Sequence, residues 1–397
     1  MCEIPGEDEV SVRVRQTIAE RKLFKAAAPL VLMVSGGSDS VALARLLAPL
    51  QQHQCVVVLH INHQLRQDAI DDETFVRKLC AELGLECVVE RVDVAACAQA
   101  WNDDLEQAGR KVRYKRAEGL LDEICLAAGL PAQAGRIATA HTMDDRAETL
   151  LMRVIVGGGS ASLASIPYKR GRIVRPLLDC RKQQLRCWLH AQAGAAQGAS
   201  EQSNVAQGAS IEQPNAAQKH GALPAEYASV PGKQAGPHQS PTKNKSSKLW
   251  CEDTSNASLE QFRGFVRHSL LPLLAQRNPN IVATLCRNAE VFSAESDYLT
   301  KAAQELLPLT SASFAAPLAL VRRAVYLAVN DAMQKLAPNA RITFEHIDLI
   351  VAKGAKPGFG WHLPGGIEVR NVKGKLCFFP AKPPLHDPRN QDRAQPK

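Results

Sequence analysis

Short, nearly continuous runs of apolar residues recur through the first half of the chain, and they constrain its fold more than any other feature. Between them lie segments with helical character, the longest covering 103–128 and stopping at Gly129. Strands that are apolar along their whole length are typical of sheets buried on both faces. The alternation therefore predicts an α/β domain with a Rossmann-like parallel sheet. The expected strands are LVLMVS at 30–35, CVVVLHIN at 55–62, ECVVERVDV at 86–94, RIATAH at 136–141 and RIVRPLL at 172–178.

The first expected strand runs into a glycine-rich loop, Ser35-Gly36-Gly37-Ser38-Asp39-Ser40, which a helical segment follows. Adjacent glycines allow a sharp turn and a close approach to a ligand. The amides of the loop and of the first helical turn then converge where the helix dipole attracts an anion. No lysine follows as in the GxxxxGK[ST] motif, so a phosphate site of another kind is predicted. The alternative is a turn that only joins strand and helix.

Polar residues gather at the ends of the second and fourth strands, where such sheets bind ligands. HINHQLR at 60–66 ends the second strand, although a solvated loop could have this composition. HTMDDRAET at 141–149 ends the fourth strand and begins a helix. The spacing of His141, Asp145 and Glu148 would align them on one stripe. The helix dipole explains acidic residues there but not the histidine, so the stripe is predicted to be functional.

A further stripe lies on the long helix and consists of Glu106, Arg110 and Arg113, with Tyr114 adjacent. The spacing fits a row of surface ion pairs as well as it fits an arginine directed at phosphates.

In combination, these clusters resemble the PP-loop ATPases and, within that group, the tRNA(Ile)-lysidine synthase family. SGGSDS is similar to the signature with which PP-loop ATPases bind ATP and split it into AMP and pyrophosphate. The lysidine synthase pattern continues with HxNHxLR, AR-xx-RY, HxxDDxxET, RPLL and DxSN. The matches, from about residue 28 to 380, are Ser35–Ser40, His60–Arg66, Arg110/Arg113/Tyr114, His141–Thr149, Arg175–Leu178, Asp253/Ser255/Asn256 and LPGG at 363–366.

Three places depart from the family pattern. Gly109 stands where AR-xx-RY has its alanine, Val156-Gly157-Gly158 replaces a common Arg-Gly pair, and RGFVR at 263–267 lacks the asparagine of RNxxR. We expect these changes to alter local contacts, chiefly to tRNA, and to leave the ATP chemistry intact.

The resemblance implies an enzyme that uses ATP and Mg²⁺ to join free L-lysine to the wobble cytidine of tRNA(Ile) with anticodon CAU. The cytosine 2-carbonyl oxygen would attack the α-phosphate and release pyrophosphate, and the ε-amine of lysine would then displace AMP. The residues that the resemblance assigns to ATP binding are Ser35, Gly36, Gly37, Ser38, Asp39, Ser40, His60 and Asn62. Those assigned to catalysis are Asp39, which would also hold the metal, Arg113, His141, Asp145 and Glu148, and those assigned to tRNA contacts are Arg66, Arg263 and Arg267.

Two other functions are compatible with the same sheet. A tRNA thiolase would activate a base similarly and then deliver sulfur, but such enzymes commonly use a cysteine pair, and the chain has no Cys-x-x-Cys. A non-catalytic nucleotide sensor would need only the loop, so the stripe of His141, Asp145 and Glu148 disfavours it.

Composition divides the chain further. Residues 191–247 are rich in Ala, Gln, Gly, Ser and Pro, contain AQGAS twice, and have too few apolar residues to offset chain entropy. Basic residues outnumber acidic ones after this segment, which suits a nucleic-acid partner. The expected parts are a PP-loop catalytic domain at 1–190, a disordered insertion at 191–247, the end of that domain with a linker helix at 248–274, and a smaller α+β tRNA-binding domain at 275–397.

The chain also indicates where the protein works. No apolar run reaches the 18 or so residues of a membrane span, and the acidic start MCEIPGEDEV does not resemble a signal peptide. Eleven scattered cysteines in a chain of this length are typical of reduced thiols. We therefore expect a cytoplasmic protein; the oligomeric state is left open.

Deleting residues 195–245 should leave the melting temperature and the turnover nearly unchanged. The entropy of closing a surface loop grows only slowly with its length, so a long insertion costs little and its removal gains little. Calorimetry and a pyrophosphate-release assay on the deletion variant test this. An inactive or unfolded variant would show that the segment packs on the protein or contacts substrate.

Overall fold

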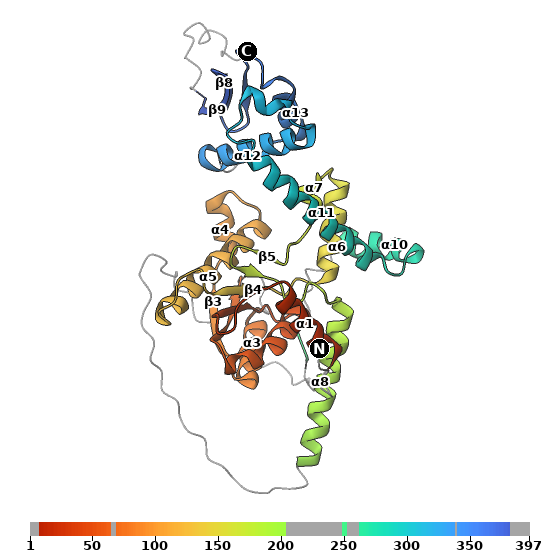
Figure 1. Ribbon diagram of the computed structural model, residues 1–397. Helices are drawn as coiled ribbons and strands as arrows, with labels where there is room; N and C mark the ends of the chain where they lie inside the picture. The colour runs from red at the N-terminus through yellow and green to blue at the C-terminus, as the bar shows by residue number, and fades with distance from the viewer. Residues whose placement is uncertain (1–7, 65–68, 204–247, 252–261, 338–339, 382–397) are drawn as a thin grey trace, which may run out of the picture. The chain divides into compact units, whose positions relative to one another are not determined.

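The computed structural model of the protein describes residues 8–64, 69–203, 248–251, 262–337 and 340–381 (Figure 1). The chain divides into two compact units. The first comprises Met1–Arg146 and Ile166–Ser269, and the second comprises Ala147–Ser165 and Leu270–Lys397. Two expected tRNA or motif positions, Arg66 and the Asp253/Ser255/Asn256 segment, lie outside the described residues.

The first unit is built on a six-stranded sheet in the order β3-β2-β1-β4-β6-β5. All neighbouring strands are parallel except the edge pair of β5 and β6, so the predicted parallel sheet is confirmed. The strand bounds are β1 Leu30–Met33, β2 Val56–Asn62, β3 Glu86–Arg91, β4 Arg136–Ala138, β5 Lys169–Arg170 and β6 Ile173–Val174. The last expected strand is thus much shorter than 172–178, because the chain turns away after Val174 into the buried loop around Leu177 and Leu178.

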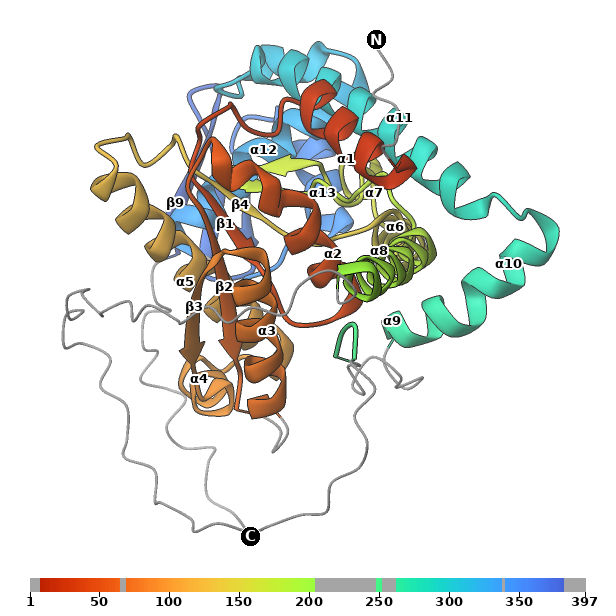
Figure 2. The ribbon, with the colours of Figure 1, turned by 90° about the horizontal axis from the view of Figure 1, so that it is seen from below.

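Successive residues of β1 pack on opposite faces of the sheet, which explains why the strand is apolar throughout. Leu30 and Leu32 join the core that α2, α3 and α8 cover, whereas Val31 joins the core beneath α5. Figure 2 shows the strands between α5 on one side and α2, α3 and α8 on the other. The helices of this unit are α1 Glu9–Glu20, α2 Ser38–Leu47, η1 Ala48–Gln52, α3 Ala69–Leu83, α4 Val94–Trp101, α5 Leu105–Ala127, α8 Lys182–Ser203, α9 Phe262–Phe265 and the π-helical η4 Val266–Leu270.

Helix α8 continues to Ser203 and so enters the segment expected to be a disordered insertion. Alanine and glutamine, which are abundant there, favour the helical conformation, so the composition that prevents a core does not prevent a helix. Residues 204–247 lie outside the described part of the chain.

The second unit combines helices with a small antiparallel sheet, as predicted for the C-terminal part. Its sheet has the order β7-β8-β9, and a core that includes Val325, Ile350 and Ile367 joins the sheet to the helices. The element bounds are α7 Ser160–Leu163, α10 Leu271–Arg277, α11 Ile281–Gln304, η5 Ser311–Ala315, α12 Leu318–Leu336, α13 Phe344–Lys353, β7 Gly360–Leu363, β8 Ile367–Val372 and β9 Lys375–Pro380. Helix α6, Met143–Ile155, begins in the first unit and ends in the second.

Among the helices of the described residues, none is both long enough and apolar enough to cross a lipid bilayer.

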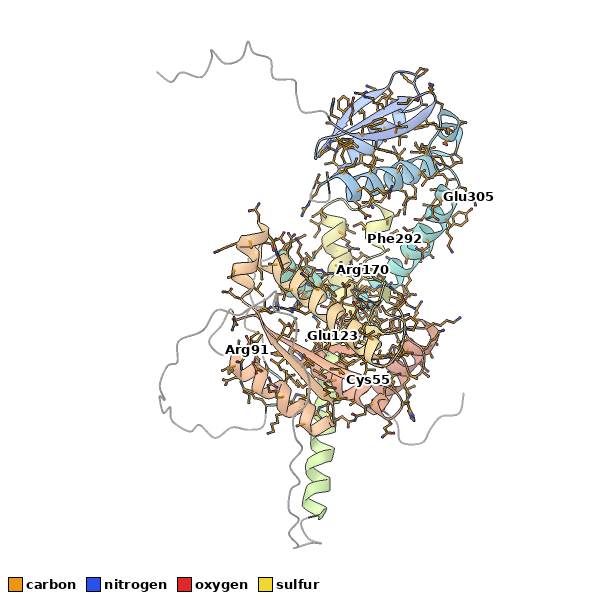
Figure 3. All side chains as sticks on the ribbon, turned by 90° about the vertical axis from the view of Figure 1, so that its left-hand side faces the viewer. Cys55, Arg91, Glu123, Arg170, Phe292 and Glu305 are labelled. Carbon is orange, nitrogen blue, oxygen red and sulfur yellow. The ribbon has the colours of Figure 1, made fainter. Side chains whose placement is uncertain are left out.

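A buried ion pair ties α3 to the end of β3. Glu73 is 4% exposed. Its carboxylate accepts hydrogen bonds from Arg91 Nε at 2.9 Å and from Arg77 Nε at 3.1 Å. Arg91, labelled in Figure 3, lies at the carboxyl end of β3, at the edge where the polar clusters gather. Hydrogen bonds from Arg91 are the largest influence on this carboxyl group and lower the pKa of Glu73 to about 2.

Glu73→Gln should lower the free energy of unfolding at pH 7 by about 1–3 kcal/mol, because the two arginines lose a charged acceptor. A carboxyl group whose pKa falls on folding stabilises the protein above its unfolded pKa, near 4.5. The difference between variant and wild type should therefore shrink as the pH falls from about 4.5 towards 2. Urea unfolding at several pH values measures it. Glu82→Gln, which removes an exposed partner of Arg45, is the matched control and should cost under about 1 kcal/mol.

Candidate active site

The loop after β1 has the strand–loop–helix geometry predicted for a phosphate site. Gly36 has a φ of +97°, which side chains other than hydrogen rarely allow, and a Cβ atom there would lie 3.3 Å from Cys251 Sγ. The Cys251 amide also donates to the Gly36 carbonyl oxygen, at 2.9 Å. Gly37 then caps α2, whose first residue is Ser38. The turn itself therefore requires glycine at Gly36, whereas Gly37 has an extended backbone with room for a Cβ atom.

The hydroxyl of Ser40 holds the loop in shape. Ser40 Oγ accepts from the amides of Ser35 at 3.2 Å and Gly36 at 3.1 Å, and donates to the Gly37 carbonyl oxygen at 2.9 Å. Ser40, predicted to bind phosphate, therefore also has a structural function. The amides of Ser35 and Gly36, predicted to point at phosphate, are held by this hydroxyl.

An ammonium group joins the loop to the acidic cluster at the start of α6. Lys182 Nζ donates to Asp145 Oδ1 at 2.9 Å and lies 3.9 Å from Asp39 Oδ2. Lys182 is the first residue of α8. The structure thus brings Asp39 and Asp145, predicted from motifs more than 100 residues apart, to the same cation.

Asp145 is buried among positive charges. In addition to Lys182, its Oδ1 atom lies 3.2 Å from the Arg263 guanidinium and 3.6 Å from that of Arg267. Its Oδ2 atom accepts from the amide and the hydroxyl of Thr142, both at 2.9 Å. Burial alone would raise the pKa of Asp145, but Lys182 and Arg263 outweigh it and hold the pKa well below its usual range. The carboxylate is therefore ionised at any physiological pH.

Asp39 differs from Asp145 because its ion pair with Lys182 is longer, 3.9 Å against 2.9 Å. Burial raises the pKa of Asp39 to about 6, although Lys182 acts in the opposite direction. Its nearest hydrogen-bond donor in the loop is Ser38 Oγ, at 3.3 Å. A half-buried carboxylate beside the glycine-rich loop suits Mg²⁺, which proteins usually hold through one or two carboxylates together with substrate phosphates. Asp39 is thus the residue in this unit that would hold the metal.

His141 precedes α6 and is not part of the helix, which begins at Met143. One ring nitrogen, Nδ1, lies 2.9 Å from Thr139 Oγ1. Burial lowers the pKa of His141 to about 4, against the opposing influence of Asp145. The ring is therefore neutral near pH 7 and has a nitrogen lone pair that can accept a proton.

Glu148 follows Asp145 by one turn of α6 and is 1% exposed. Of the three residues of the predicted stripe, only Asp145 and Glu148 lie on the helix. Its histidine stands at the strand end instead.

His60 and Asn62 are buried at the end of β2 and bond to the backbone. His60 Nδ1 donates to the Val34 carbonyl oxygen at 2.9 Å, directly before the loop. Asn62 donates to the Ala69 carbonyl oxygen at 3.2 Å and accepts from the Gln64 amide at 3.0 Å. Both side chains therefore hold the backbone around the end of β2 in place, in addition to any contact that they make with ATP.

The predicted arginines occupy two environments. Arg113 is exposed on α5, and its Nε atom donates to the Gly109 carbonyl oxygen at 3.3 Å. Arg263 and Arg267, predicted to contact tRNA, are half-buried on α9 and η4 and face Asp145. Their contacts here are with the acidic cluster.

Sequence reasoning missed the basic residues at the start of α8. Arg181 Nε donates to Asp144 at 3.0 Å, Lys182 joins Asp39 and Asp145, and Arg186 Nε lies 3.4 Å from Ser38 Oγ. The available signal was the run Arg181-Lys182 beside a helix start without an acidic residue in the first turn. Positively charged side chains interact unfavourably with the helix dipole at a helix N-terminus. Their presence there indicates that they pair with acidic groups outside the helix.

Searched over its described residues, the chain contains no group of three or more His, Cys, Asp or Glu side chains placed to bind a metal ion on their own.

Curated proteins provide a comparison over nearly the whole chain. The tRNA(Ile)-lysidine synthase of Thermus thermophilus is 31% identical over 380 residues, which are 93% of this chain and 60% of that protein. The tRNA(Ile)-lysidine synthase of Geobacter sulfurreducens is 28% identical over 394 residues, 94% of this chain and 69% of that protein. This chain therefore spans about three-fifths of the length of the Thermus relative.

Among solved structures, a U34-tRNA thiolase from Methanococcus maripaludis with its [4Fe-4S] cluster aligns with a TM-score of 0.44 at 16% identity, covering 72% of this chain and 78% of that one. Such a distant likeness does not distinguish between functions.

A family description, the PP-loop domain, matches residues 7–205. This range is half of the chain and contains the glycine-rich loop, the acidic start of α6 and Lys182. The chain therefore belongs to the PP-loop domain family.

Proposed function

We propose that the protein is a tRNA(Ile)-lysidine synthase, which adenylates the wobble cytidine of a CAU anticodon and then replaces AMP with lysine. The proposal rests on the similarity to curated lysidine synthases over 93% of the chain. The structural observation that supports it is the Lys182 ammonium group between Asp39 and Asp145. Asp39 belongs to the expected phosphate site and Asp145 to the expected cytosine site. Their shared contact supports the proposal because the cytosine must lie next to the α-phosphate that it attacks.

In the first step, the chain's task is to hold and neutralise the triphosphate. The helix start at Ser38 offers amides and a dipole to the phosphates, and Lys182 and Arg186 stand close enough to the loop to add positive charge. A magnesium ion held by Asp39 would neutralise further phosphate charge. Arg113, exposed at the same edge of the sheet, is the candidate to stabilise the negative charge that develops on the α-phosphate.

In the second step, the chain must accept a lysine whose ε-amine has a pKa of about 10.4 and is protonated near pH 7. A carboxylate attracts the ammonium ion, and a base must then remove one proton. We assign the binding of the incoming ammonium to Glu148, a carboxylate that lies one turn of α6 after Asp145. Neutral His141 is the candidate base.

One assay separates this function from the alternatives. AMP formation with bulk tRNA should depend on added lysine. Dependence on a sulfur donor instead would identify a thiolase, and no AMP under either condition would identify a nucleotide-binding regulator.

Asp39→Asn should reduce pyrophosphate release at least a hundredfold while tRNA affinity changes less than about twofold. The reason is that the loss of one charge-stabilising group at a phosphate site costs about 10²–10³ in rate. Single-turnover pyrophosphate release and tRNA filter binding measure the two effects. A parallel loss of tRNA affinity would mean that the loop has another role.

The same variant carries its own folding control. Because the pKa of Asp39 is about 6 in the folded protein and near 3.8 in the unfolded chain, ionisation favours unfolding as the pH rises between these values. Asp39→Asn should therefore be more stable than wild type above pH 6, and the gain should vanish below about pH 4. A variant that is inactive yet more stable at pH 7.5 has lost chemistry and not its fold.

Glu148→Gln should slow the transfer of lysine at least tenfold more than it slows adenylation, so that adenylated tRNA accumulates. The amide keeps the size of the side chain but cannot attract the ammonium ion by charge. Single-turnover experiments that follow pyrophosphate and AMP separately measure the two steps, and raising the pH should partly restore the second one.

Glu123→Gln, at an exposed position of α5, is the matched control and should change neither rate. Equal slowing of both steps in Glu148→Gln would assign Glu148 to the ATP or metal site instead.

A further inference from the structure

An open groove of about 540 Å³ lies along the outer side of α4 and α5, outside the cluster around Asp145. Its lining combines two aromatic rings with three cations and one carboxylate: Trp101, Arg110, Lys111, Tyr114, Lys115 and Glu118. Trp101 is 41% exposed. The Arg110 guanidinium lies 5.1 Å from the centre of the Tyr114 ring, and Lys111 Nζ lies 5.9 Å from the centre of the Trp101 ring.

The rings in this groove are held on a rigid support. Helix α4 ends at Trp101, where Asn102 takes the left-handed conformation with a φ of +51° and turns the chain back into α5. The two helices pack through a buried cluster of four residues, Val94, Ala98, Ala108 and Val112. Trp101 is therefore exposed because the backbone places it there, and not because the segment is loosely packed.

The groove lies close to the candidate active site. Helix α5 begins at the carboxyl edge of the sheet, where a Cβ atom on Gly109 would lie 3.8 Å from His63 Cε1. Among the described residues, the buried Nδ1 atom of His63 has no hydrogen-bond partner. Tyr114, which lines the groove, interacts with Arg175. Besides burial, the positive charges of Arg175 and Arg110 lower the pKa of His141. The first three turns of α5 thus lie between the groove and His141, the residue proposed as the general base.

We propose that this groove binds the single-stranded RNA next to the nucleotide that is modified, with one base stacked on Trp101 and the backbone phosphates held by Arg110 and Lys115. The proposal takes RNA as the substrate and in that respect rests on the proposed function. Arg110 and Tyr114 belong to the motif pattern, and the proposal adds Trp101 as a stacking residue and Lys115 as a phosphate contact, neither of which belongs to that pattern.

The chemistry of the lining favours this occupant. Unpaired bases in RNA loops are recognised by stacking on aromatic rings, and their phosphates by Arg and Lys. The three cations of the lining outnumber its carboxylate, Glu118, together with Asp103, which accepts from Lys111 Nζ at 2.6 Å, so the groove has a net positive charge. A paired stem would present no free base to Trp101. The groove should therefore distinguish a loop from a helix.

The test uses the full-length protein and an RNA stem–loop with CAU in the loop, followed by fluorescence anisotropy at fixed salt. Trp101→Ala should weaken binding of the stem–loop about tenfold, as expected when one base loses its stacking partner, whereas Trp101→Phe should retain most of the affinity. Lys115→Ala should weaken binding and lower the salt dependence by about one phosphate contact. Neither change should alter ATP affinity or binding of a loop-free duplex.

Two exposed positions provide matched controls: Leu126→Ala at the far end of α5 and Lys78→Ala on α3, which covers the opposite face of the sheet. Both should bind the stem–loop as wild type does. Unchanged affinity in Trp101→Ala, an equal loss for the duplex, or no stem–loop binding by the wild-type protein would each overturn the proposal.

The same measurements separate a failure of this proposal from a failure of the proposed function. If wild type binds the stem–loop through Trp101 yet releases no pyrophosphate with tRNA, the proposed function fails and the groove assignment stands. If wild type turns over fully while Trp101→Ala binds the stem–loop unchanged, the groove assignment fails and the proposed function stands.

Discussion

The charge cluster around Asp145 is the interaction on which the candidate site depends. It joins the start of α6, the start of α8 and the segment of α9 and η4, which are far apart in the sequence. A buried carboxylate is costly unless cations and donors surround it, and removing one partner from such a cluster commonly costs about 3–5 kcal/mol. Because the partners come from three segments, the cluster can form only when the whole unit has folded. The geometry of the site and the integrity of the fold are thus coupled at one carboxylate.

Lys182 lies at different distances from Asp39 and Asp145, and this difference leads us to assign the two carboxylates different roles. The ammonium group is 2.9 Å from Asp145 but 3.9 Å from Asp39. The pKa of Asp145 falls and that of Asp39 rises to about 6. Neighbouring acids whose environments move their pKa values apart are usually assigned different tasks. Asp145 is held by closely spaced cations, whereas Asp39 lies farther from Lys182 and beside the glycine-rich loop, and for this reason we propose Asp39 as the metal ligand.

The sequence predicted what is local and missed what is made by long-range contact. The first strand and the loop after it were predictable, because burial on both faces demands a continuous apolar run and the turn demands glycine at Gly36. The stripe of His141, Asp145 and Glu148 was predicted with the wrong geometry, since Thr139 draws His141 towards the strand end and α6 begins only at Met143. Lys182 was missed because its partner Asp145 lies 37 residues away, a distance that no periodicity spans.

Helix α5 contributes both to the core of the first unit and to the groove that we propose binds RNA. Its inner face, with Ala117, Leu121 and Cys125, packs on Val31 and Ile137 of the sheet, and its first turns hold α4 through Ala108 and Val112. These contacts fix the outer face of the helix relative to the strand ends. A side chain on that face therefore keeps a constant position with respect to the loop after β1, as a group that positions a substrate for in-line attack must do.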